Sequence, residues 1–323
     1  MIDSNFSCLP LSETTLHNLG ELGMVQMTPI QAESLPDILQ GRDVIAQAKT
    51  GSGKTAAFGL GLLHQLESKR FRVQALVLCP TRELADQVAK ELRRLARMSD
   101  NTKILTLSGG LPFGPQLDSL RHGVHVVVGT PGRVLKHLEK GSLVLKNLQT
   151  LVLDEADRML DMGFIEEIEK VISYAPSQRQ TLLFSATYPQ EIEQLSRSVQ
   201  RNAIQIETQS REVANQIEEY FYEVPPKQKS AALVQALAHH KPENAMVFSN
   251  TKQGAREITE VLRKQGVDAL AIHGDLEQIQ RTDVLVQFAN GSCAVLVATD
   301  VAARGLDIKA LGMVINYDLP HDE

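Results

Sequence analysis

The chain has 323 residues, of which 43% are hydrophobic, so it exceeds one ordinary core and can bury two. Its formal net charge of −6 argues against a protein that coats nucleic acid by bulk electrostatics, although it allows a local basic track. The sequence has neither a basic opening segment followed by an apolar run nor an apolar stretch long enough to span a bilayer. We therefore predict a cytoplasmic protein without a membrane segment.

The cysteines are scattered and lack the spacing of metal ligands: Cys8, Cys79 and Cys293. An odd number of separated cysteines is typical of reduced thiols in a cytoplasmic chain. We therefore expect neither a zinc site nor another metal cluster.

The first pattern in chain order is Met27-Thr28-Pro29-Ile30-Gln31, inside a segment that otherwise favours helices. A single glutamine there is ordinarily a surface residue. Its amide can, however, donate and accept a hydrogen bond at once, which suits an adenine edge. The spacing alone gives the adenine interpretation of Gln31 little support.

The next pattern is a glycine turn between a predicted strand at 44–46 and a predicted helix. Gly51 and Gly53 let the backbone aim several N–H groups at one anion. Lys54 adds a positive charge, and the Thr55 hydroxyl is the expected ligand for the Mg²⁺ that accompanies a triphosphate. The alternative is a flexible turn followed by a chance lysine, but the flanking strand and helix favour phosphate binding. The expected loop comprises Ala48, Lys49, Thr50, Gly51, Ser52, Gly53, Lys54 and Thr55.

Short apolar runs then alternate with helix-compatible segments, and each run ends in a polar cluster. The runs are 76–78, 104–107, 126–128, 151–153 and 182–184. Continuous apolar strands alternating with helices predict an α/β fold whose parallel sheet is covered on both faces. Ligands of such folds bind beyond the carboxyl ends of the strands, so the polar clusters should share one edge.

Asp154 and Glu155 follow one of these predicted strands. Beside a phosphate-binding loop, the Asp154 carboxylate can hold the magnesium shell, directly or through water, and Glu155 can deprotonate the attacking water. The alternative is an acidic helix N-terminus, where both side chains would meet the helix dipole favourably. The loop on the same sheet favours the catalytic interpretation.

Two segments rich in glycine and proline, Gly109-Gly110 and 130–133, are ordinary turn signals when each is taken alone. If both segments lie on one edge of the sheet with Arg82 and Arg133, their N–H groups and hydroxyls could contact a sugar-phosphate backbone without distinguishing bases.

The pattern breaks at 207–215, which is polar and aperiodic. We therefore expect a first domain over 1–206, a linker over 207–215 and a second domain over 216–323. The second half repeats the α/β series without a phosphate-binding loop, with predicted strands at 220–222, 246–248, 269–272, 295–297 and 313–315. A nucleotide bound by one half could be closed upon by the other.

Taken together, the ordered motifs resemble those of the DEAD-box RNA helicases over nearly the whole chain. They are 28–31, 48–55, 80–85, 109–110, 130–133, 154–157, 185–187, 273–275 and 299–307. The stretches 47–61 and 75–88 most resemble a bacterial ribosomal-RNA helicase of that family. The resemblance implies two tandem RecA-like domains, each a mostly parallel sheet covered by helices, the second incomplete.

The resemblance also implies roles at the ATP site. Phe6 and Gln31 would contact adenine, and Asp307 would approach the ribose. ATP and Mg²⁺ are the implied cofactors, with the phosphate, metal and water roles assigned as above.

A further set of residues would couple ATP to RNA. Ser185 and Thr187 would hydrogen-bond Asp157. The RNA backbone would be gripped by residues of both halves: Thr81, Arg82, Gly110, Thr130, Arg133, Gln278, Arg281, Thr299 and Asp300. Closure on ATP and RNA would then bend one strand and separate a short duplex. The implied partner is ribosomal RNA during large-subunit assembly, and we expect a monomer.

One departure from the family lies at the end of the chain. The sequence stops at Glu323, before an arginine-rich motif that supplies a finger worth about 10³ to 10⁵ in rate, so we expect slow ATP turnover. We also expect the chain to lack the RNA-binding domain of the related subfamily. Two alternatives stay open: an ATP-driven motor or switch acting on DNA or protein, and a non-catalytic RNA clamp.

Overall fold

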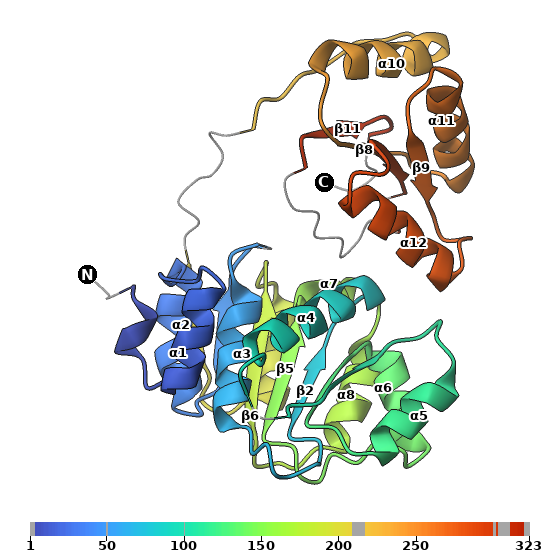
Figure 1. Ribbon diagram of the computed structural model, residues 1–323. Helices are drawn as coiled ribbons and strands as arrows, with labels where there is room; N and C mark the ends of the chain where they lie inside the picture. The colour runs from blue at the N-terminus through green and yellow to red at the C-terminus, as the bar shows by residue number, and fades with distance from the viewer. Residues whose placement is uncertain are drawn as a thin grey trace. The chain divides into compact units, whose positions relative to one another are not determined.

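The computed structural model describes residues 4–49, 51–99, 101–208, 217–299, 302 and 311–319. The chain divides into two compact units, Met1–Val213 and Ala214–Glu323. Figure 1 shows a central sheet with helices around it in each unit. Of the predicted linker, only residues 207 and 208 belong to the described part, so the predicted domain boundaries stay a prediction.

The first unit is built on a seven-stranded sheet in which every pairing is parallel. The strand order is β3-β4-β2-β5-β6-β1-β7. The strands are β1 (Val44–Gln47), β2 (Ala75–Leu78), β3 (Ile104–Leu107), β4 (Val126–Gly129), β5 (Thr150–Asp154), β6 (Gln180–Ser185) and β7 (Ile204–Glu207). Every strand predicted in this half lies within one of these, because a strand buried on both faces reads as a continuous apolar run. The predicted α/β class is confirmed.

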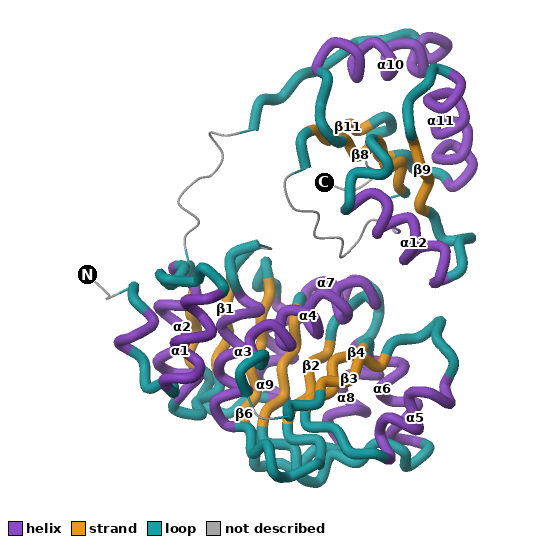
Figure 2. The backbone as a smooth tube through the Cα atoms, viewed as in Figure 1, coloured by secondary structure: helices purple, strands orange, loops and turns teal. Residues whose placement is uncertain are grey.

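Helices cover both faces of this sheet, as Figure 2 shows. Successive β1 side chains point to opposite faces: Val44 and Ala46 pack with α2, α3 and α4, whereas Ile45 packs with α6, α8 and α9. The helices are η1 (Phe6–Cys8), α1 (Glu13–Glu21), α2 (Pro29–Leu39), α3 (Lys54–Gln65), α4 (Arg82–Leu95), α5 (Phe113–Arg121), α6 (Pro131–Glu139), α7 (Ala156–Asp161), α8 (Ile165–Ser173) and α9 (Gln190–Val199). With both faces of the sheet covered by helices, the carboxyl ends of the strands are where ligands of such folds bind.

The second unit has a four-stranded parallel sheet in the order β11-β8-β10-β9. Its elements are η3 (Pro226–Gln228), α10 (Lys229–His240), β8 (Ala245–Phe248), α11 (Lys252–Lys264), β9 (Ala269–Ile272), α12 (Gln278–Ala289), β10 (Val295–Ala298) and β11 (Met313–Asn316). Apolar residues of α10 and α11 pack on one face, and Phe288 of α12 packs on the other. This unit therefore repeats the layered plan of the first.

One predicted strand is wrong: residues 220–222 form neither a strand nor a helix. Tyr220 and Tyr222 are more than half exposed, and Phe221 is 91% exposed. The tyrosine hydroxyls have local partners instead, since Tyr220 donates to Glu218 at 2.6 Å and Tyr222 lies 2.8 Å from Nε2 of His240. Aromatic residues favour strands when they pack on a half-buried sheet, and within the described residues this segment pairs with no strand.

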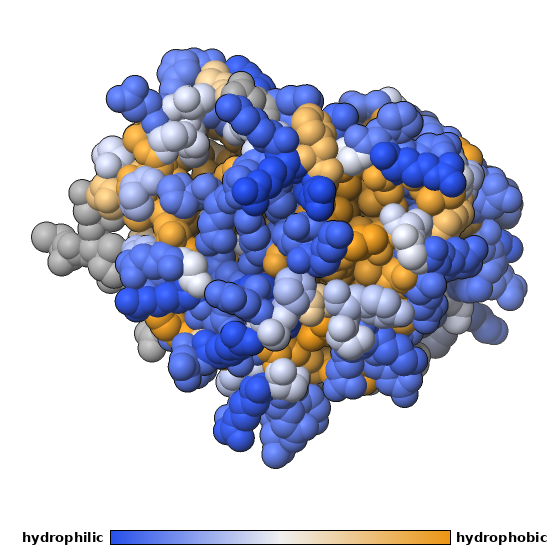
Figure 3. Space-filling model, turned by 90° about the horizontal axis from the view of Figure 1, so that it is seen from below, coloured by the Kyte–Doolittle hydropathy of each residue, from blue (hydrophilic) through white to orange (hydrophobic). Residues whose placement is uncertain are grey.

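The described helices include none that is long and apolar enough to cross a membrane. Figure 3 shows hydrophilic side chains over most of the face in view, with hydrophobic patches between them. Many of the larger exposed apolar side chains lie on separate segments, for example Val25, Val144 and Ile279, and such scattered exposure is ordinary for a globular chain. The exceptions are Ile217, Tyr220, Phe221 and Tyr222, which follow one another closely in the sequence and are all exposed.

Candidate ATP and RNA site

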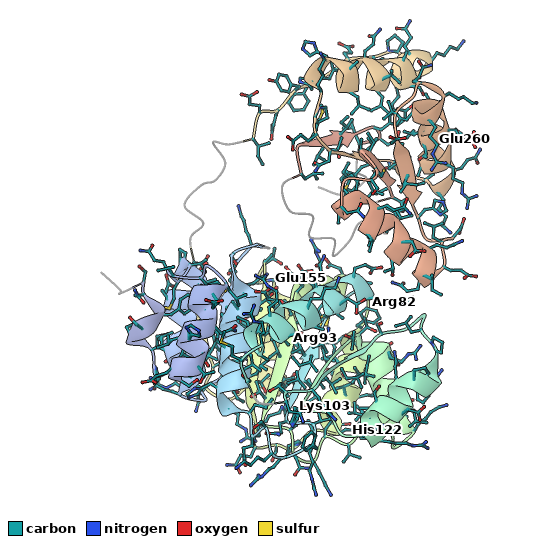
Figure 4. The ribbon with its side chains drawn as sticks, viewed as in Figure 1. Arg82, Arg93, Lys103, His122, Glu155 and Glu260 are labelled. Atoms are coloured by element: carbon teal, nitrogen blue, oxygen red, sulfur yellow. The ribbon has the colours of Figure 1, made fainter. Side chains whose placement is uncertain are left out.

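Predicted functional residues follow several strands of the first unit at the edge where those strands end, here called the carboxyl edge. The phosphate-binding loop follows β1, while Arg82, Thr130 and Glu155 come soon after β2, β4 and β5. Figure 4 shows Arg82 and Glu155 at this edge, with Lys103 and His122 toward the opposite end of the unit. The parallel topology therefore gathers residues that are far apart in sequence.

The phosphate-binding loop turns through two residues with positive φ, Gly51 at 80° and Gly53 at 93°. A Cβ atom at Gly53 would lie 2.5 Å from Nε2 of Gln31 and 3.0 Å from Oγ1 of Thr28. Gly53 directly precedes α3, whose N-terminus at Lys54 faces the loop with its unpaired N–H groups. Conformation and space both require glycine here, and the result is a cradle for a phosphate group.

Gln31 is not a surface residue, because only 2% of it is exposed. Its Oε1 accepts a hydrogen bond from the Thr28 N–H at 2.9 Å, and its Nε2 donates to the Gly53 carbonyl at 3.0 Å. The amide therefore ties the start of α2 to the phosphate-binding loop. Phe6 is also buried, in an apolar cluster with residues of α1, α2 and α3. The adenine contacts expected of both residues stay a prediction.

Two opposite charges are buried beside the loop. Lys54 is 6% exposed and Asp154 is 3% exposed. In the described part of the chain, neither Nζ of Lys54 nor Oδ1 of Asp154 has a hydrogen-bond partner, and Oγ of Ser52 has none. Burial raises the pKa of Asp154 to about 6, against the opposing effect of the nearby Lys54 charge. Buried polar atoms ordinarily have hydrogen-bond partners, so the lack of partners for these three atoms indicates that a ligand binds here.

The residues present fit a magnesium ion held together with phosphate oxygens. Mg²⁺ prefers oxygen ligands and usually takes only one or two carboxylates from the protein. Asp154 supplies a carboxylate with an unused buried oxygen. Thr55 supplies a half-buried hydroxyl in the first turn of α3.

Glu155 has an unusual backbone for a residue with a side chain, with φ at 52° in the left-handed region. It follows β5 directly and precedes α7, and its buried carboxylate lies 3.0 Å from Nη1 of Arg158. Burial raises the pKa of Cys79, and the charges of Asp154 and Glu155 raise it further, so this thiol stays neutral. Cys79 is fully buried near these two carboxylates, a position that its isolated place in the sequence did not indicate.

Asp157 connects α7 to the end of β6. Its Oδ2 accepts hydrogen bonds from the Ala186 N–H at 3.1 Å, the Thr187 N–H at 2.9 Å and the Thr187 hydroxyl at 3.0 Å. The Asp157 N–H donates to Oγ of Ser185 at 3.3 Å. The Ser185 carbonyl in turn accepts from the N–H of Ala48 at the start of the phosphate-binding loop, at 3.0 Å. The structure thus brings the three predicted coupling residues together next to that loop.

The predicted RNA-contacting residues of the first unit lie at helix starts and turns. Thr81 caps α4, since its hydroxyl accepts from the Leu84 N–H at 3.2 Å, and Thr130 directly precedes α6. Arg82 lies against the glycine turn, where a Cβ at Gly109 would be 3.2 Å from Nη2 of the arginine. Gly110 continues this exposed turn with φ at 75°.

Arg133, the last of this set, is held by partners that sequence analysis missed. Its Nη1 donates to Oε1 of Gln116 at 3.0 Å, and its Nη2 donates to the Leu111 carbonyl at 2.9 Å. Burial lowers the pKa of Arg133, and the nearby charge of Arg82 lowers it further. The carboxyl edge therefore carries two arginines close enough to repel each other.

The second unit places its predicted RNA-contacting residues around β10 and α12. Gln278 begins α12, and Nη2 of Arg281 donates to the Ala302 carbonyl at 3.1 Å. Thr299 is buried after β10, and its N–H donates to the Ile272 carbonyl at 3.3 Å. Three predicted site residues lie outside the described residues: Thr50, Asp300 and Asp307.

The 273–275 motif follows β9 and belongs to an ion-pair cluster. Asp275 lies 2.5 Å from Nζ of Lys252 and 2.9 Å from Nη2 of Arg256. Nε of Arg256 also donates to Nε2 of His273 at 3.1 Å. These basic partners come from α11, and the sequence spacing gave no sign of them.

Comparison with known protein families identifies both halves of the chain. The DEAD/DEAH box helicase family matches residues 28–195, and the helicase conserved C-terminal domain matches residues 228–323. The ATP-dependent RNA helicase DbpA of Escherichia coli K12 is 58% identical over 99% of this chain and 69% of its own length. The DEAD-box ATP-dependent RNA helicase CshA of Bacillus cereus is 45% identical over 99% of this chain, which spans 61% of that relative. The predicted subfamily resemblance is confirmed.

Solved structures of this family share the fold. A DEAD box protein from Methanococcus jannaschii is 39% identical, with a TM-score of 0.62 over 99% of this chain and 86% of that one. Saccharomyces cerevisiae Dbp5 bound to RNA and ADP BeF3 is 30% identical, with a TM-score of 0.86 over 98% of this chain and 81% of that one. Together with two parallel α/β sheets, these likenesses confirm the predicted pair of RecA-like domains. The chain belongs to the DEAD-box family of ATP-dependent RNA helicases.

Proposed function

We propose that this chain binds ATP with Mg²⁺ at the carboxyl edge of its first unit and uses hydrolysis to separate short RNA duplexes, in assembly of the large ribosomal subunit. The observation that carries the ATP site is the buried pair Lys54 and Asp154 beside a glycine cradle, because Nζ of Lys54 and Oδ1 of Asp154 have no hydrogen-bond partner among the described residues. A charge without a partner is costly to bury, and a phosphate–metal group would satisfy both. Ribosomal RNA is proposed because residues 47–61 and 75–88 resemble a bacterial ribosomal-RNA helicase of the family.

In this proposal, the first unit positions the triphosphate for attack by water. Lys54 and the loop N–H groups hold the phosphate oxygens, while Thr55 and Asp154 hold the metal. When bound, Mg²⁺ neutralises charge on the phosphates. The water oxygen forms a bond to the γ-phosphorus as the bond to the ADP oxygen breaks, and Glu155 accepts the proton that the water loses.

The coupling of ATP to RNA is proposed to run through Asp157. Its bonds to the 185–187 segment join α7, which begins beside Glu155, to the strand end next to the phosphate-binding loop. RNA is proposed to lie against Thr81, Arg82, Gly110, Thr130, Arg133, Gln278, Arg281, Thr299 and Asp300. We also propose domains at 1–206 and 216–323, acting as a monomer in the cytoplasm, with Phe6, Gln31 and Asp307 around the nucleoside.

The first test is Glu155→Gln. The amide fits the same space but cannot accept the proton of water, so we expect ATP binding to be kept and hydrolysis to fall by about 10² to 10⁴-fold. Glu169→Gln, at an exposed glutamate of α8, is the matched control. ATP binding is measured by fluorescence of a labelled nucleotide and hydrolysis by phosphate release. Hydrolysis at the parent rate in Glu155→Gln would show that the base is another group.

The second test compares nucleic acids. ATP turnover is measured for the chain alone, with RNA and with DNA of the same sequence. ATP turnover that rises with RNA but not with DNA supports the proposal. Stimulation by DNA only would overturn the RNA assignment, and RNA binding without any turnover would favour a non-catalytic clamp.

A further inference from the structure

Gln116 lies at the centre of a buried network between two segments proposed to contact RNA. It belongs to α5 and is 5% exposed. Its Oε1 accepts from Nη1 of Arg133 at 3.0 Å, and Nε2 of His137 lies 3.1 Å from the same oxygen. Its Nε2 donates to the Ser108 carbonyl at 3.1 Å, directly before the Gly109-Gly110 turn. One amide therefore joins this glycine turn to the first turn of α6.

The orientation of the amide is fixed by its neighbours. Burial lowers the pKa of His137 to about 4, and the charges of Arg133, Lys140 and Lys136 lower it further, so the ring is neutral at pH 7. The guanidinium of Arg133 can only donate, and the Ser108 carbonyl can only accept. The amide oxygen must therefore face Arg133, and the neutral His137 must carry its proton on Nε2 to donate to that oxygen. The Phe113 ring stacks on His137 with centroids 4.0 Å apart and closes the network on one side.

Arg133 needs such a partner because it is close to another positive charge. Burial disfavours the charged form of Arg133 and so lowers its pKa, and the nearby charge of Arg82 lowers it further. Gln116 and the Leu111 carbonyl hold the guanidinium in place without neutralising it. The guanidinium has more N–H donors than these two bonds use, so it can still grip a phosphate.

We propose that Gln116 is a positioning residue for RNA: it orders Arg133 in advance and sets its distance from the Gly109-Gly110 turn. This inference rests on the proposed contact of Arg133 with the RNA backbone. A preordered guanidinium binds a phosphate without first losing side-chain freedom, so the amide raises affinity without touching RNA itself. It takes no part in ATP binding.

Gln116→Met tests this, because methionine keeps the volume and removes both hydrogen-bonding groups. Affinity for a labelled single-stranded RNA is measured by fluorescence anisotropy in the presence of a non-hydrolysable ATP analogue. We expect binding to weaken about tenfold, as for loss of a hydrogen bond to a charged group. ATP affinity without RNA should be unchanged. Gln178→Met, at an exposed glutamine after α8, is the matched control and should bind RNA like the parent.

A double-mutant cycle with Arg133→Ala separates positioning from general loosening of the fold. If Gln116 acts through Arg133, Gln116→Met has no further effect on RNA affinity once the arginine is gone. Additive losses, or unchanged affinity in Gln116→Met alone, would overturn the inference. A parent chain that binds no RNA would instead overturn the proposed function, and the inference with it.

A second variant covers the case in which Gln116→Met does not fold, as judged by circular dichroism. Gln116→Glu keeps the oxygen acceptor for Arg133 and His137 but places a negative charge against the guanidinium. The carboxylate then competes with RNA phosphate, so we expect RNA affinity to fall at least about tenfold, and less at high salt. Parent-like RNA affinity in Gln116→Glu would show that the Arg133 guanidinium grips no RNA phosphate, and the inference would fall with that contact.

Discussion

The two sheets of this chain share one architecture but treat acidic residues at their carboxyl edges in opposite ways. In the first unit, Asp154 is buried and its Oδ1 has no hydrogen-bond partner within the described part of the chain, and burial raises its pKa to about 6 even though Lys54 is near. In the second, Asp275 is exposed and paired with Lys252 and Arg256, and the hydrogen bond from Lys252 lowers its pKa. The buried charge of Asp154 therefore lowers the stability of the folded chain, whereas the charge of Asp275 already has partners within the protein.

The fold alone therefore does not determine the chemistry at the carboxyl edge of a sheet. A parallel sheet offers the same strand ends in both units, but among the residues that the structure describes only the first unit places a glycine cradle and a buried lysine beside its acid. A buried polar group that lacks hydrogen-bond partners marks a candidate ligand-binding site. The exposed ion pairs of the second unit instead join Asp275, in the segment after β9, to side chains of α11.

The largest expected effect comes from Asp154→Asn. Hydrolysis should fall by about 10²-fold or more, because the metal would lose its carboxylate. The free chain should nevertheless become more stable, by up to about 3 kcal/mol at neutral pH. The sign follows from the raised pKa: above pH 6 the folded state must hold a charge that the unfolded state holds more easily, and asparagine removes that charge.

Thermal unfolding and phosphate release measure these two effects in one preparation. Asp161→Asn, at an exposed acid of α7, is the control and should change neither. A fall in stability of Asp154→Asn would mean that the buried carboxylate is satisfied within the free chain, and the contrast between the edges would fail.

An intermediate effect is expected from pH, through His137. Its folded-state pKa of about 4 lies below the ordinary value of 6.5, so the unfolded chain takes up the proton first as pH falls. The contribution of His137 to stability should therefore decrease from pH 6.5 downward, by at most about 2 kcal/mol at pH 5, against the opposing gain expected from protonation of Asp154 in the same range. His137→Asn should flatten this part of the profile, measured by thermal unfolding across pH. His122→Asn, at an exposed histidine of the same unit, should keep the parent profile, and an unchanged slope in His137→Asn would contradict the assignment.

The smallest effect is expected from Asp275→Asn. Both ion pairs of this residue are solvent-exposed, so their loss should lower the melting temperature by only a few degrees at most, and less at high salt. Calorimetry at two salt concentrations checks the size and the salt dependence. A rise in melting temperature, as expected for Asp154→Asn, would show that the two edges are alike after all.

Local patterns predicted most of the sheet architecture. The runs at 76–78 and 126–128 became β2 and β4 because a strand with both faces covered must be apolar throughout. Tyr220, Phe221 and Tyr222 have equally high strand propensity, yet they form no strand. Propensity records how well a side chain suits a sheet surface, and it cannot supply a neighbouring strand.

The candidate site was predicted where its residues are adjacent in sequence and missed where they meet through the fold. Lys54, Asp154 and Glu155 stand in motifs whose chemistry can be inferred from residue type and spacing. Gln116 could not be found this way, because its bond to Arg133 depends on how α5 packs between a turn and another helix. Buried amides carry no sequence signal of their own, since glutamine is mostly exposed.

At Glu155, the left-handed backbone conformation lowers stability, while the side chain is proposed to serve the reaction. A residue with a Cβ is strained in this conformation, whereas glycine adopts it freely. Glu155→Gly would therefore relieve strain while it removes the proposed base, so the substitution that best suits the fold would abolish the reaction. Sequence redesign aimed only at relieving backbone strain would replace this residue with glycine and would yield a folded but inactive protein.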